Sequence, residues 1–392
     1  MVIVKIVLLA LVGLYLIRLV VGHLLTWYYF DHYDRFCRAT EHKPEVSIIK
    51  PVRGVDHRAL DNFRSFCNQE YRNHYEIIFC VENGEDPVVP VIEQLMEEYP
   101  EKDIRLVFSA PEGKRSAGKV RNMVVGLAES KGEVIIFSDS DVHVSPRFLR
   151  DVVACMDNTH IGLAFSVPAY EGAENCAAAM LSVAVNTVVV SLTPLCLIGG
   201  YDRAIGMTMV TRRDVLDEIG GLEQFEGELA DDVALATAIH EKGYGIHLLS
   251  EPARVYHIRD TFPKVWRHAL RWLVTIRLYS PITVYLAALV DIPLVWAIAY
   301  LIISIVHNTG VLIGLLLIAG VIAARLISFA VINAKFVQDG GFWRFIWVAP
   351  LLDLLKAPLL VYCFMTNEIV WRGRRVYVNS DRTLTYLHNR PG

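Results

Sequence analysis

The most constraining feature of this chain is the way its apolar residues are segregated along the sequence. From Met1 to Trp27 the main polar interruptions are Lys5, Arg18 and His23. This stretch is longer than the roughly 20 apolar residues that a helix needs to cross a bilayer. It lacks the small-residue cleavage site of a signal peptide, so we expect a transmembrane anchor over residues 1–27. We expect the side chain of Arg18 to reach the interface or to pack against another helix, rather than to serve transport.

A second apolar region begins at Pro281 and is interrupted by a polar turn at 307–310. We expect a transmembrane hairpin over residues 281–337. The next stretch, 342–366, contains Asp353, Lys356 and two prolines, so we expect it to cross the membrane, to enter and return, or to lie in the interface. The whole chain of 392 residues is 54% hydrophobic with a mean hydropathy of +0.37, which is more apolar than is usual for a soluble protein.

The region between these apolar segments, residues 44–260, has mixed polarity and the length of one domain. Apolar, β-branched runs at 46–49, 77–81, 104–108 and 134–138 alternate with helical patterns. This alternation predicts an α/β domain with a mostly parallel sheet that is covered by helices. Two of the helices are predicted to begin at caps formed by Asp56 and by Asp86-Pro87.

Acidic side chains gather where the predicted strands end. Asp139 and Asp141 directly follow the run 134–138, and Asp86 follows the run 77–81. Two carboxylates one residue apart at a strand end can share a hard divalent cation, which in turn can hold a diphosphate. Farther along, Asp231 and Asp232 precede a predicted helix over 233–242, where one acid would suffice as a cap. Each acid alone is explained by a turn or a cap, but the ordered set is not.

An amphipathic stretch, residues 261–280, precedes the predicted hairpin and contains His268, Arg271 and Trp272. Tryptophan and arginine commonly anchor such a segment in the membrane interface. Taken alone, the stretch is therefore explained as an interfacial helix.

Taken together, these features resemble the ceramide glucosyltransferase family over most of the chain. The resemblance rests on the order of Asp86, Asp139, Asp232 and Arg271-Trp272, with one amino-terminal span and a hydrophobic carboxyl-terminal region. Four local segments are similar as well: 50–56 to the family's K-P-L-K-G-V-D, 86–87 to its aspartate-proline, 206–208 to its G-M-S and 213–222 to its K-D-V-L-D run ending in G-G-L.

Two positions depart from the family pattern. The final motif usually begins with Gln or Arg, whereas His268 stands there in this chain, with Arg267 one residue before it. In some members the second aspartate is followed by Ser-Gly, whereas here Asp139-Ser140-Asp141 forms a complete D-x-D pair. The complete pair favours a metal site.

The resemblance implies a GT-A type nucleotide-sugar domain with transmembrane helices, and an inverting glycosyltransferase. It would move a sugar, with glucose as the first candidate, from a UDP-sugar to the hydroxyl of a ceramide-like membrane lipid. Asp86 would contact uracil, and Asp139 with Asp141 would hold Mg²⁺ or Mn²⁺. Asp232 would be the general base, with Asp231 beside it in contact with substrate.

The resemblance also implies substrate contacts outside the acidic set. Arg271 would pair with the diphosphate and Trp272 would border the acceptor, with His268 in the same substrate-binding motif. Lys119 and Asn122 resemble a K-x-x-N element near the nucleotide-sugar. A solvated basic face is the alternative for this loop, which also contains Lys114, Arg115 and Arg121.

Basic residues predict the orientation of the chain in the membrane. Arg35, Arg38 and Lys43 follow the first span, Arg267, Arg271 and Arg277 precede the second, and the hairpin tip has no lysine or arginine. We therefore expect a cytoplasmic catalytic domain on a bacterial inner membrane or an internal membrane. Arg372, Arg374 and Arg375 predict a cytoplasmic tail over 367–392. This favours a stretch 342–366 that does not cross.

Composition excludes some classes of partner, and several alternative functions can be compared with the sequence. Seven cysteines without a C-x-x-C pair fit a reducing compartment, and a net charge of −4 without a long basic run argues against nucleic acid as a partner. A hopanoid or diacylglycerol acceptor in place of ceramide stays open. A processive polysaccharide synthase has similar aspartates but needs a channel, for which we predict too few spans. A non-enzymatic membrane scaffold would be expected to have lost a metal or base carboxylate.

Overall fold

The computed structural model describes residues 1–32, 43–109, 118–198, 204–371, 374–379, 382 and 384–387. The chain divides into two compact units. The first, which we call the sheet unit, comprises Tyr28–Ala169 and Cys196–Tyr256, and the second, the helical unit, comprises Met1–Trp27, Tyr170–Leu195 and His257–Gly392. The stretch predicted as one domain, 44–260, thus contributes residues 170–195 to the helical unit.

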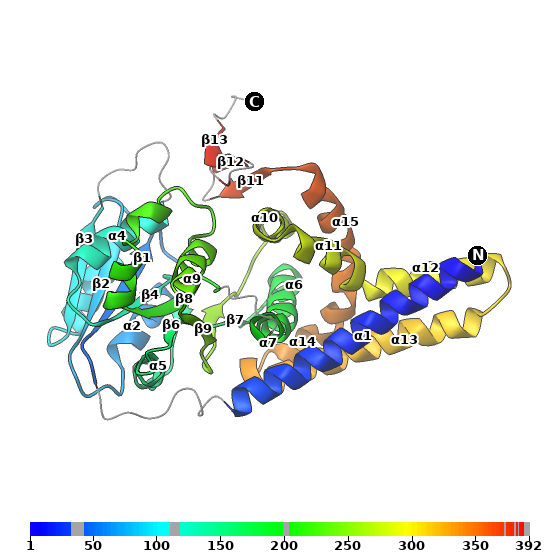
Figure 1. The fold of residues 1–392 in the computed structure, drawn as a ribbon, viewed down its shortest axis with the longest axis horizontal. Helices are drawn as coiled ribbons and strands as arrows, with labels where there is room; N and C mark the ends of the chain where they lie inside the picture. Colours follow the sequence, from blue (N-terminus) through cyan, green and yellow to red (C-terminus); the bar gives the residue numbers. More distant parts are fainter. Residues whose placement is uncertain are drawn as a thin grey trace. The chain divides into compact units, whose positions relative to one another are not determined.

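The sheet unit is built on a seven-stranded sheet of order β3-β2-β1-β4-β8-β6-β9 (Figure 1). Its strands are β1 (Val46–Val52), β2 (Tyr75–Val81), β3 (Asp103–Phe108), β4 (Val134–Ser138), β6 (Ile161–Phe165), β8 (Thr208–Arg212) and β9 (Gly245–Leu248). The first four run parallel, and β8 runs antiparallel to both β4 and β6. The predicted alternation of strands and helices is confirmed, since all four predicted strand runs lie in the parallel half.

The helices of the sheet unit connect its strands. They are α2 (Ala59–Cys67), α3 (Val89–Glu98), α4 (Gly118–Glu129), α5 (Phe148–Met156), α8 (Arg213–Glu218) and α9 (Asp231–Glu241). A second, small sheet has the order β5-β10-β7, formed by β5 (Val142–His143), β10 (Ala253–Tyr256) and β7 (Pro168–Glu171).

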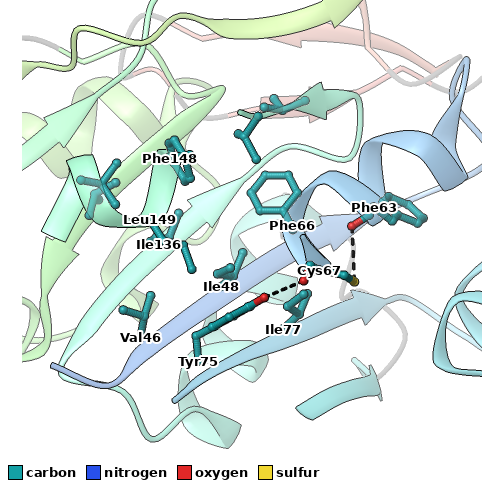
Figure 2. Close-up of a cluster of buried hydrophobic side chains, with 14 of the residues drawn as sticks. Val46, Ile48, Phe63, Phe66, Cys67, Tyr75, Ile77, Ile136, Phe148 and Leu149 are labelled. Atoms are coloured by element: carbon teal, nitrogen blue, oxygen red, sulfur yellow. Dashed lines mark hydrogen bonds between the residues drawn. The ribbon is translucent and has the colours of Figure 1, made fainter. Parts of the chain in front are cut away.

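The core lies against one face of the large sheet (Figure 2). Alternate residues of the central strands point into it, because side chains in a strand alternate between its two faces. They meet large apolar side chains of α2 and α5. All of these residues are nearly inaccessible: Val46, Ile48, Ile77 and Ile136 from the strands, with Phe63, Phe66, Phe148 and Leu149 from the helices. On the opposite face α4 packs closely on Ile49, since a Cβ atom on Gly126 would lie 2.5 Å from its Cγ2.

Two predicted helix starts are wrong. α3 begins at Val89 and not at Asp86-Pro87, and α2 begins at Ala59, after Arg58 in a left-handed conformation with φ of 56°. Asp56 instead accepts a hydrogen bond from Ser140 in another loop, and Asp86 accepts one from the backbone of Gly54 besides a local one from the N–H of Val88 at 3.0 Å. Long-range contacts therefore take up the side chain of Asp56 and share that of Asp86.

The helical unit contains four helical stretches that are long and apolar enough to cross a membrane, counted over the described residues. They are α1 (Val2–Asp31), the stretch Cys176–Pro194, which includes α6 (Cys176–Ala184), the stretch Val311–Val337, which includes α13 (Val311–Ile332), and the stretch Phe342–Met365, which ends in α15 (Leu352–Met365). The second of these is not anticipated from the sequence. The predicted span from 282 to 306 is broken at Asp291, which separates α11 (Pro281–Val290) from α12 (Pro293–Val306).

The amphipathic stretch forms α10 (Phe262–Tyr279). The predicted tail contains a three-stranded antiparallel sheet of β11 (Glu368–Trp371), β12 (Arg374–Val378) and β13 (Leu384–Tyr386). Five of the basic residues used in the sequence analysis lie outside the described residues: Arg35, Arg38, Lys114, Arg115 and Arg372.

The burial of Phe66 in the core predicts the cost of removing its side chain. Replacing Phe66 by alanine should lower the stability of the sheet unit by about 3–5 kcal/mol, because it leaves a cavity among buried side chains. Phe108, which is 49% exposed, is the control, and Phe108→Ala should cost less than about 1 kcal/mol. Unfolding of the purified protein in detergent measures both, and equal costs would contradict the placement of the core.

Candidate active site

The D-x-D turn follows β4 and is held by neighbouring loops. The backbone N–H of Asp139 donates to the carbonyl of Met207, 2.9 Å away, just ahead of β8. The hydroxyl of Ser140 donates to Oδ2 of Asp56 at 2.5 Å, which brings the loop after β1 to the same turn. Three carboxylates, those of Asp56, Asp139 and Asp141, thus lie around one turn.

The negative charges around this turn change the protonation equilibrium of its carboxyl groups. Burial, together with the charges of Asp139 and Asp56, raises the pKa of Asp141 to about 7. A nearby cation would stabilise the ionised form of such a carboxyl group. The described residues contain no group of three His, Cys, Asp or Glu side chains arranged to hold a metal. Asp139 and Asp141 stay the predicted cation ligands, and carboxylate oxygens such as theirs suit a hard cation whose other ligands are phosphate oxygens and water.

A buried lysine lies beneath the turn, and the sequence analysis assigns it no role. Lys50 is 0% exposed, and its ammonium donates to the carbonyl of Asp139 at 2.9 Å and to Oγ of Ser138 at 3.2 Å. Burial lowers its pKa to about 7, although Asp139 and Asp141 raise it. The available signal is a lysine within an otherwise apolar strand, since Lys50 interrupts β1 near its carboxyl end.

Lys119 joins the D-x-D turn to the second acidic pair. Its Nζ lies 3.0 Å from Oδ1 of Asp139 and 3.2 Å from Oδ2 of Asp231, and it donates to the carbonyl of Gly206 at 3.0 Å. Burial alone lowers the pKa of Lys119, but the charges of Asp139, Asp231 and Asp232 raise it by more. Lys119 is thus a cation between two groups of carboxylates.

Asp232 is held by backbone hydrogen bonds at the start of α9. Its Oδ2 accepts from the N–H of Gly206 and its Oδ1 from the N–H of Val233, both at 2.8 Å. The N-cap residue of α9 is Ala230, so Asp232 is not the cap that local sequence suggests. Burial and the charge of Asp231 raise the pKa of Asp232 to about 6, while Lys119 lowers it.

Asp86 and Asn122 have mainly structural contacts. The carboxylate of Asp86 accepts from the N–H of Gly54 at 2.9 and 3.0 Å, and Gly54 has a φ of +70° that favours glycine. The buried amide of Asn122 accepts from Oγ of Ser109 at 2.6 Å and donates to the carbonyl of Cys80 at 2.9 Å. Asn122 therefore fixes α4 to the ends of β2 and β3.

The three remaining predicted residues lie on α10 of the helical unit. Spacings of three and four residues place His268, Arg271 and Trp272 on one face of this helix. The rings of His268 and Trp272 meet edge to face with centroids 4.5 Å apart. Burial and the neighbouring Arg271 lower the pKa of His268 to about 3, so its ring is neutral at physiological pH. Its buried Nε2 has no hydrogen-bond partner among the described residues.

Comparison with known proteins places these residues in context. The family model described as glycosyl transferase family 21 matches residues 6–384. Ceramide glucosyltransferase 3 of Caenorhabditis elegans is 30% identical over 217 residues, which are 54% of this chain and 46% of that protein. Ceramide glucosyltransferase 1 of the same organism is 26% identical over 235 residues, 59% of this chain and 49% of that protein. The chain thus spans about half the length of these curated relatives.

A solved structure resembles the fold. It is the mannosyltransferase PcManGT from Pyrobaculum calidifontis in complex with GDP-Man and Mn²⁺, with a TM-score of 0.50 and 15% sequence identity. The match covers 91% of this chain and 99% of that protein. At this identity the likeness concerns the fold alone, and it confirms the prediction of a GT-A type domain.

The close approach of Gly206 to Asp232 generates a second prediction. A Cβ atom at position 206 would lie 3.0 Å from Cβ and 3.1 Å from Oδ2 of Asp232, so Gly206→Ala should push this carboxylate away. Overpacking of this kind costs about 1–3 kcal/mol. Gly84, where a Cβ atom would meet only Phe108 at 3.9 Å, is the control. Gly84→Ala should change the unfolding midpoint little, and a Gly206→Ala variant as stable as that control would refute the packing.

Proposed function

The chain belongs to glycosyl transferase family 21, and from this premise we propose that it transfers a sugar from a nucleotide-sugar to a hydroxyl group of a membrane lipid. One observation supports this most: Lys119 joins the D-x-D residue Asp139 to Asp231, beside Asp232, at the strand ends of the sheet unit. The similarity to ceramide glucosyltransferases favours a UDP-sugar donor, with glucose first, and a ceramide-like acceptor. A hopanoid or diacylglycerol acceptor is the alternative.

The donor would bind at the carboxyl ends of the parallel strands, as ligands of such sheets do. Asp139 and Asp141 would hold Mg²⁺ or Mn²⁺, which when bound supplies positive charge to the diphosphate as it leaves. Lys50 would keep the turn in place through the carbonyl of Asp139. Lys119 would donate to a diphosphate oxygen, with Asn122 supporting its helix, and Asp86 would contact the uracil.

Asp232 would act as the general base. It would take the proton of the lipid hydroxyl while the hydroxyl oxygen forms a bond to C1 of the sugar. The bond from C1 to the diphosphate oxygen would break on the opposite face, with its electron pair leaving on the diphosphate, so a single displacement inverts C1. A pKa of about 6 leaves this carboxylate ionised at neutral pH but basic enough to share a proton. The N–H groups of Gly206 and Val233 fix its orientation.

The residues on α10 would serve the diphosphate and the acceptor. Arg271 would pair with the diphosphate, a geometry to which the planar guanidinium is suited. Trp272 would border the acceptor lipid, with His268 packed on its ring. An amphipathic helix of this kind lies at the membrane surface, where the polar part of a lipid is found.

We propose a cytoplasmic orientation for the sheet unit of this membrane protein. In the sequence, Lys43 follows the first apolar segment and Arg267 and Arg277 precede the hairpin, whose tip at 307–310 has no lysine or arginine. The organisation would comprise an anchor over 1–27, a catalytic domain over 44–260 that is interrupted by residues 170–195 of the helical unit, an interfacial helix over 261–280 and a hairpin over 281–337. Residues 342–366 would form an interfacial or re-entrant segment, ahead of a cytoplasmic tail over 367–392.

The reaction can be tested directly. Membranes containing the full chain, incubated with a panel of UDP-sugars and lipid acceptors, should yield one glycosylated lipid that mass spectrometry of the extract identifies. Asp232→Asn should lower the rate at least about 100-fold, because the amide cannot accept the proton. UDP-sugar binding should survive in this variant, since it depends on other residues.

The unfolding midpoint of the Asp232→Asn variant separates catalysis from folding. An asparagine oxygen still accepts a hydrogen bond from Gly206, so the midpoint should change little. A variant that retains most of its activity would exclude Asp232 as the base and make Asp231 the candidate. Failure of every sugar and lipid in the panel with the parent protein would reject the proposed function itself.

The metal pair generates a separate prediction. Asp139→Asn or Asp141→Asn should lower turnover at least about 100-fold in folded protein, because each removes a ligand of the cation. Chelation by EDTA should abolish the activity of the parent protein, and added Mg²⁺ or Mn²⁺ should restore it. Asp214, whose side chain is 66% exposed on α8, is the matched control, and Asp214→Asn should keep its activity. Full activity in EDTA would refute the metal assignment.

A further inference from the structure

A group of charged side chains lies inside the helical unit, apart from all residues assigned to catalysis. We call it the polar layer; its members are Tyr15 and Arg18 of α1, Asp291 ahead of α12, Arg325 of α13, and Asp353 and Lys356 of α15. Arg18 Nη2 lies 2.6 Å from Oδ1 of Asp291, and Arg325 forms an ion pair with Asp353. Arg18, which is expected to reach the interface or to pack against another helix, thus pairs with Asp291 in the break between α11 and α12.

The polar layer lies at one end of a part of the helical unit that contains no charged residues, which we call the charge-free slab. Between the layer and the hairpin tip, the segments 6–17, 292–306 and 311–324 contain no acidic or basic residue. At a rise of 1.5 Å per residue these segments span about 18–23 Å, somewhat less than the roughly 30 Å of a hydrocarbon core. At the other edge Lys5 donates to the carbonyl of Thr309 at 2.6 Å. Beyond the layer, polar contacts resume between His23 and Ser328.

The polar layer has a surplus of positive charge. Arg18, Arg325 and Lys356 supply three cations, whereas Asp291 and Asp353 supply two anions, which leaves a formal charge of +1. Hydrogen-bond donors are in surplus too. Among the described residues no hydrogen bond is made by the buried atoms Nε and Nη1 of Arg18, Nε of Arg325, Nζ of Lys356 and the hydroxyl of Tyr15. Buried donors without acceptors are costly, so these atoms point to an oxygen-rich anion.

The members of the polar layer differ in how deeply they are buried. The side chains of Arg325 and Asp353 are 4% and 0% exposed, and the backbone N–H of Leu294 at the start of α12 donates to Asp353 at 3.0 Å. The side chain of Arg18 is 16% exposed and Lys356 is partly exposed, so these two side chains border the surface of the helical unit, although Nζ of Lys356 and Nε and Nη1 of Arg18 are themselves buried. A ligand that comes from the lipid phase would meet these two side chains first and would have to displace them slightly to reach the buried donors.

We propose that the polar layer binds the phosphodiester headgroup of an anionic phospholipid. One phosphodiester carries one negative charge, which neutralises the surplus of one, and its oxygens accept hydrogen bonds from Arg18 and Lys356. Phosphates of a leaflet lie at the edge of its hydrocarbon, and the polar layer lies where the charge-free slab ends, on the side away from the hairpin tip. The slab is shorter than the hydrocarbon core, so the long side chains of Arg18 and Lys356 would extend toward the phosphate. This inference does not depend on the proposed catalytic function.

Lipid-dependent stability tests the proposal. The full chain is reconstituted in vesicles of phosphatidylcholine alone or of phosphatidylcholine mixed with phosphatidylglycerol, and its thermal unfolding midpoint is measured. Phosphatidylglycerol should raise the midpoint, because a ligand of the native state stabilises it. Lys356→Met should lose this increase and keep its transferase activity in phosphatidylcholine. Lys335→Met, which removes a basic residue of the same unit outside the polar layer, should keep the increase.

Four outcomes would overturn the proposal. An equal loss in both lysine variants indicates diffuse attraction to an anionic surface, and an undiminished increase in Lys356→Met excludes this residue as a ligand. An equal increase from inorganic phosphate in detergent without phospholipid identifies a free anion instead of a lipid. Mass spectrometry of lipids retained by the purified parent protein is independent of the variants: phosphatidylglycerol should be retained over phosphatidylcholine, and no preference would refute the assignment.

Discussion

The fold of the sheet unit depends on balancing the negative charge that its topology collects at one edge. Parallel strands end together, so the loops after β1 and β4 bring Asp56, Asp139 and Asp141 to one place. Repulsion among partly buried carboxylates would favour an open site, but two lysines oppose it. Lys50 lies beneath the turn, and Lys119 links it to the acids of α9. The lysines that reduce the repulsion among the carboxylates also fix the positions of these charges, so that a charged ligand would meet a preorganised electric field.

Much of this arrangement can be predicted from local patterns. Apolar β-branched runs locate β1 to β4, and the rule that ligands bind beyond strand ends selects Asp139 and Asp141. The strand predictions succeed because the burial of strands follows from periodicity along the chain, whereas the role of Asp139 and Asp141 stays a prediction. The acidic pair at 231–232 can also be recognised in the sequence, because a helix start requires only one acidic residue as a cap.

The parts that could not be predicted depend on contacts between distant residues. Asp56 has the sequence of a helix cap, yet its carboxylate binds Ser140 in another loop, at the expense of a cap worth about 1 kcal/mol. The carboxylate of Asp86 keeps a local hydrogen bond from the N–H of Val88 and also binds the backbone of Gly54, which the local sequence does not reveal. The ammonium of Lys50 becomes relevant only once β4 lies beside β1. Likewise, the pairing of Arg18 with Asp291 joins residues far apart in sequence, which no periodicity reveals.

The path of the chain after β7 has a practical consequence. The chain leaves the sheet unit after Ala169, forms the apolar stretch Cys176–Pro194 in the helical unit, and returns at Cys196 to supply β8 between β4 and β6. A fragment trimmed to 44–260 would therefore still carry an apolar helix long enough to cross a membrane, and deleting that helix would cut the covalent path to a central strand. Detergent or lipid is therefore the sensible choice when such a fragment is purified, even with the terminal spans removed.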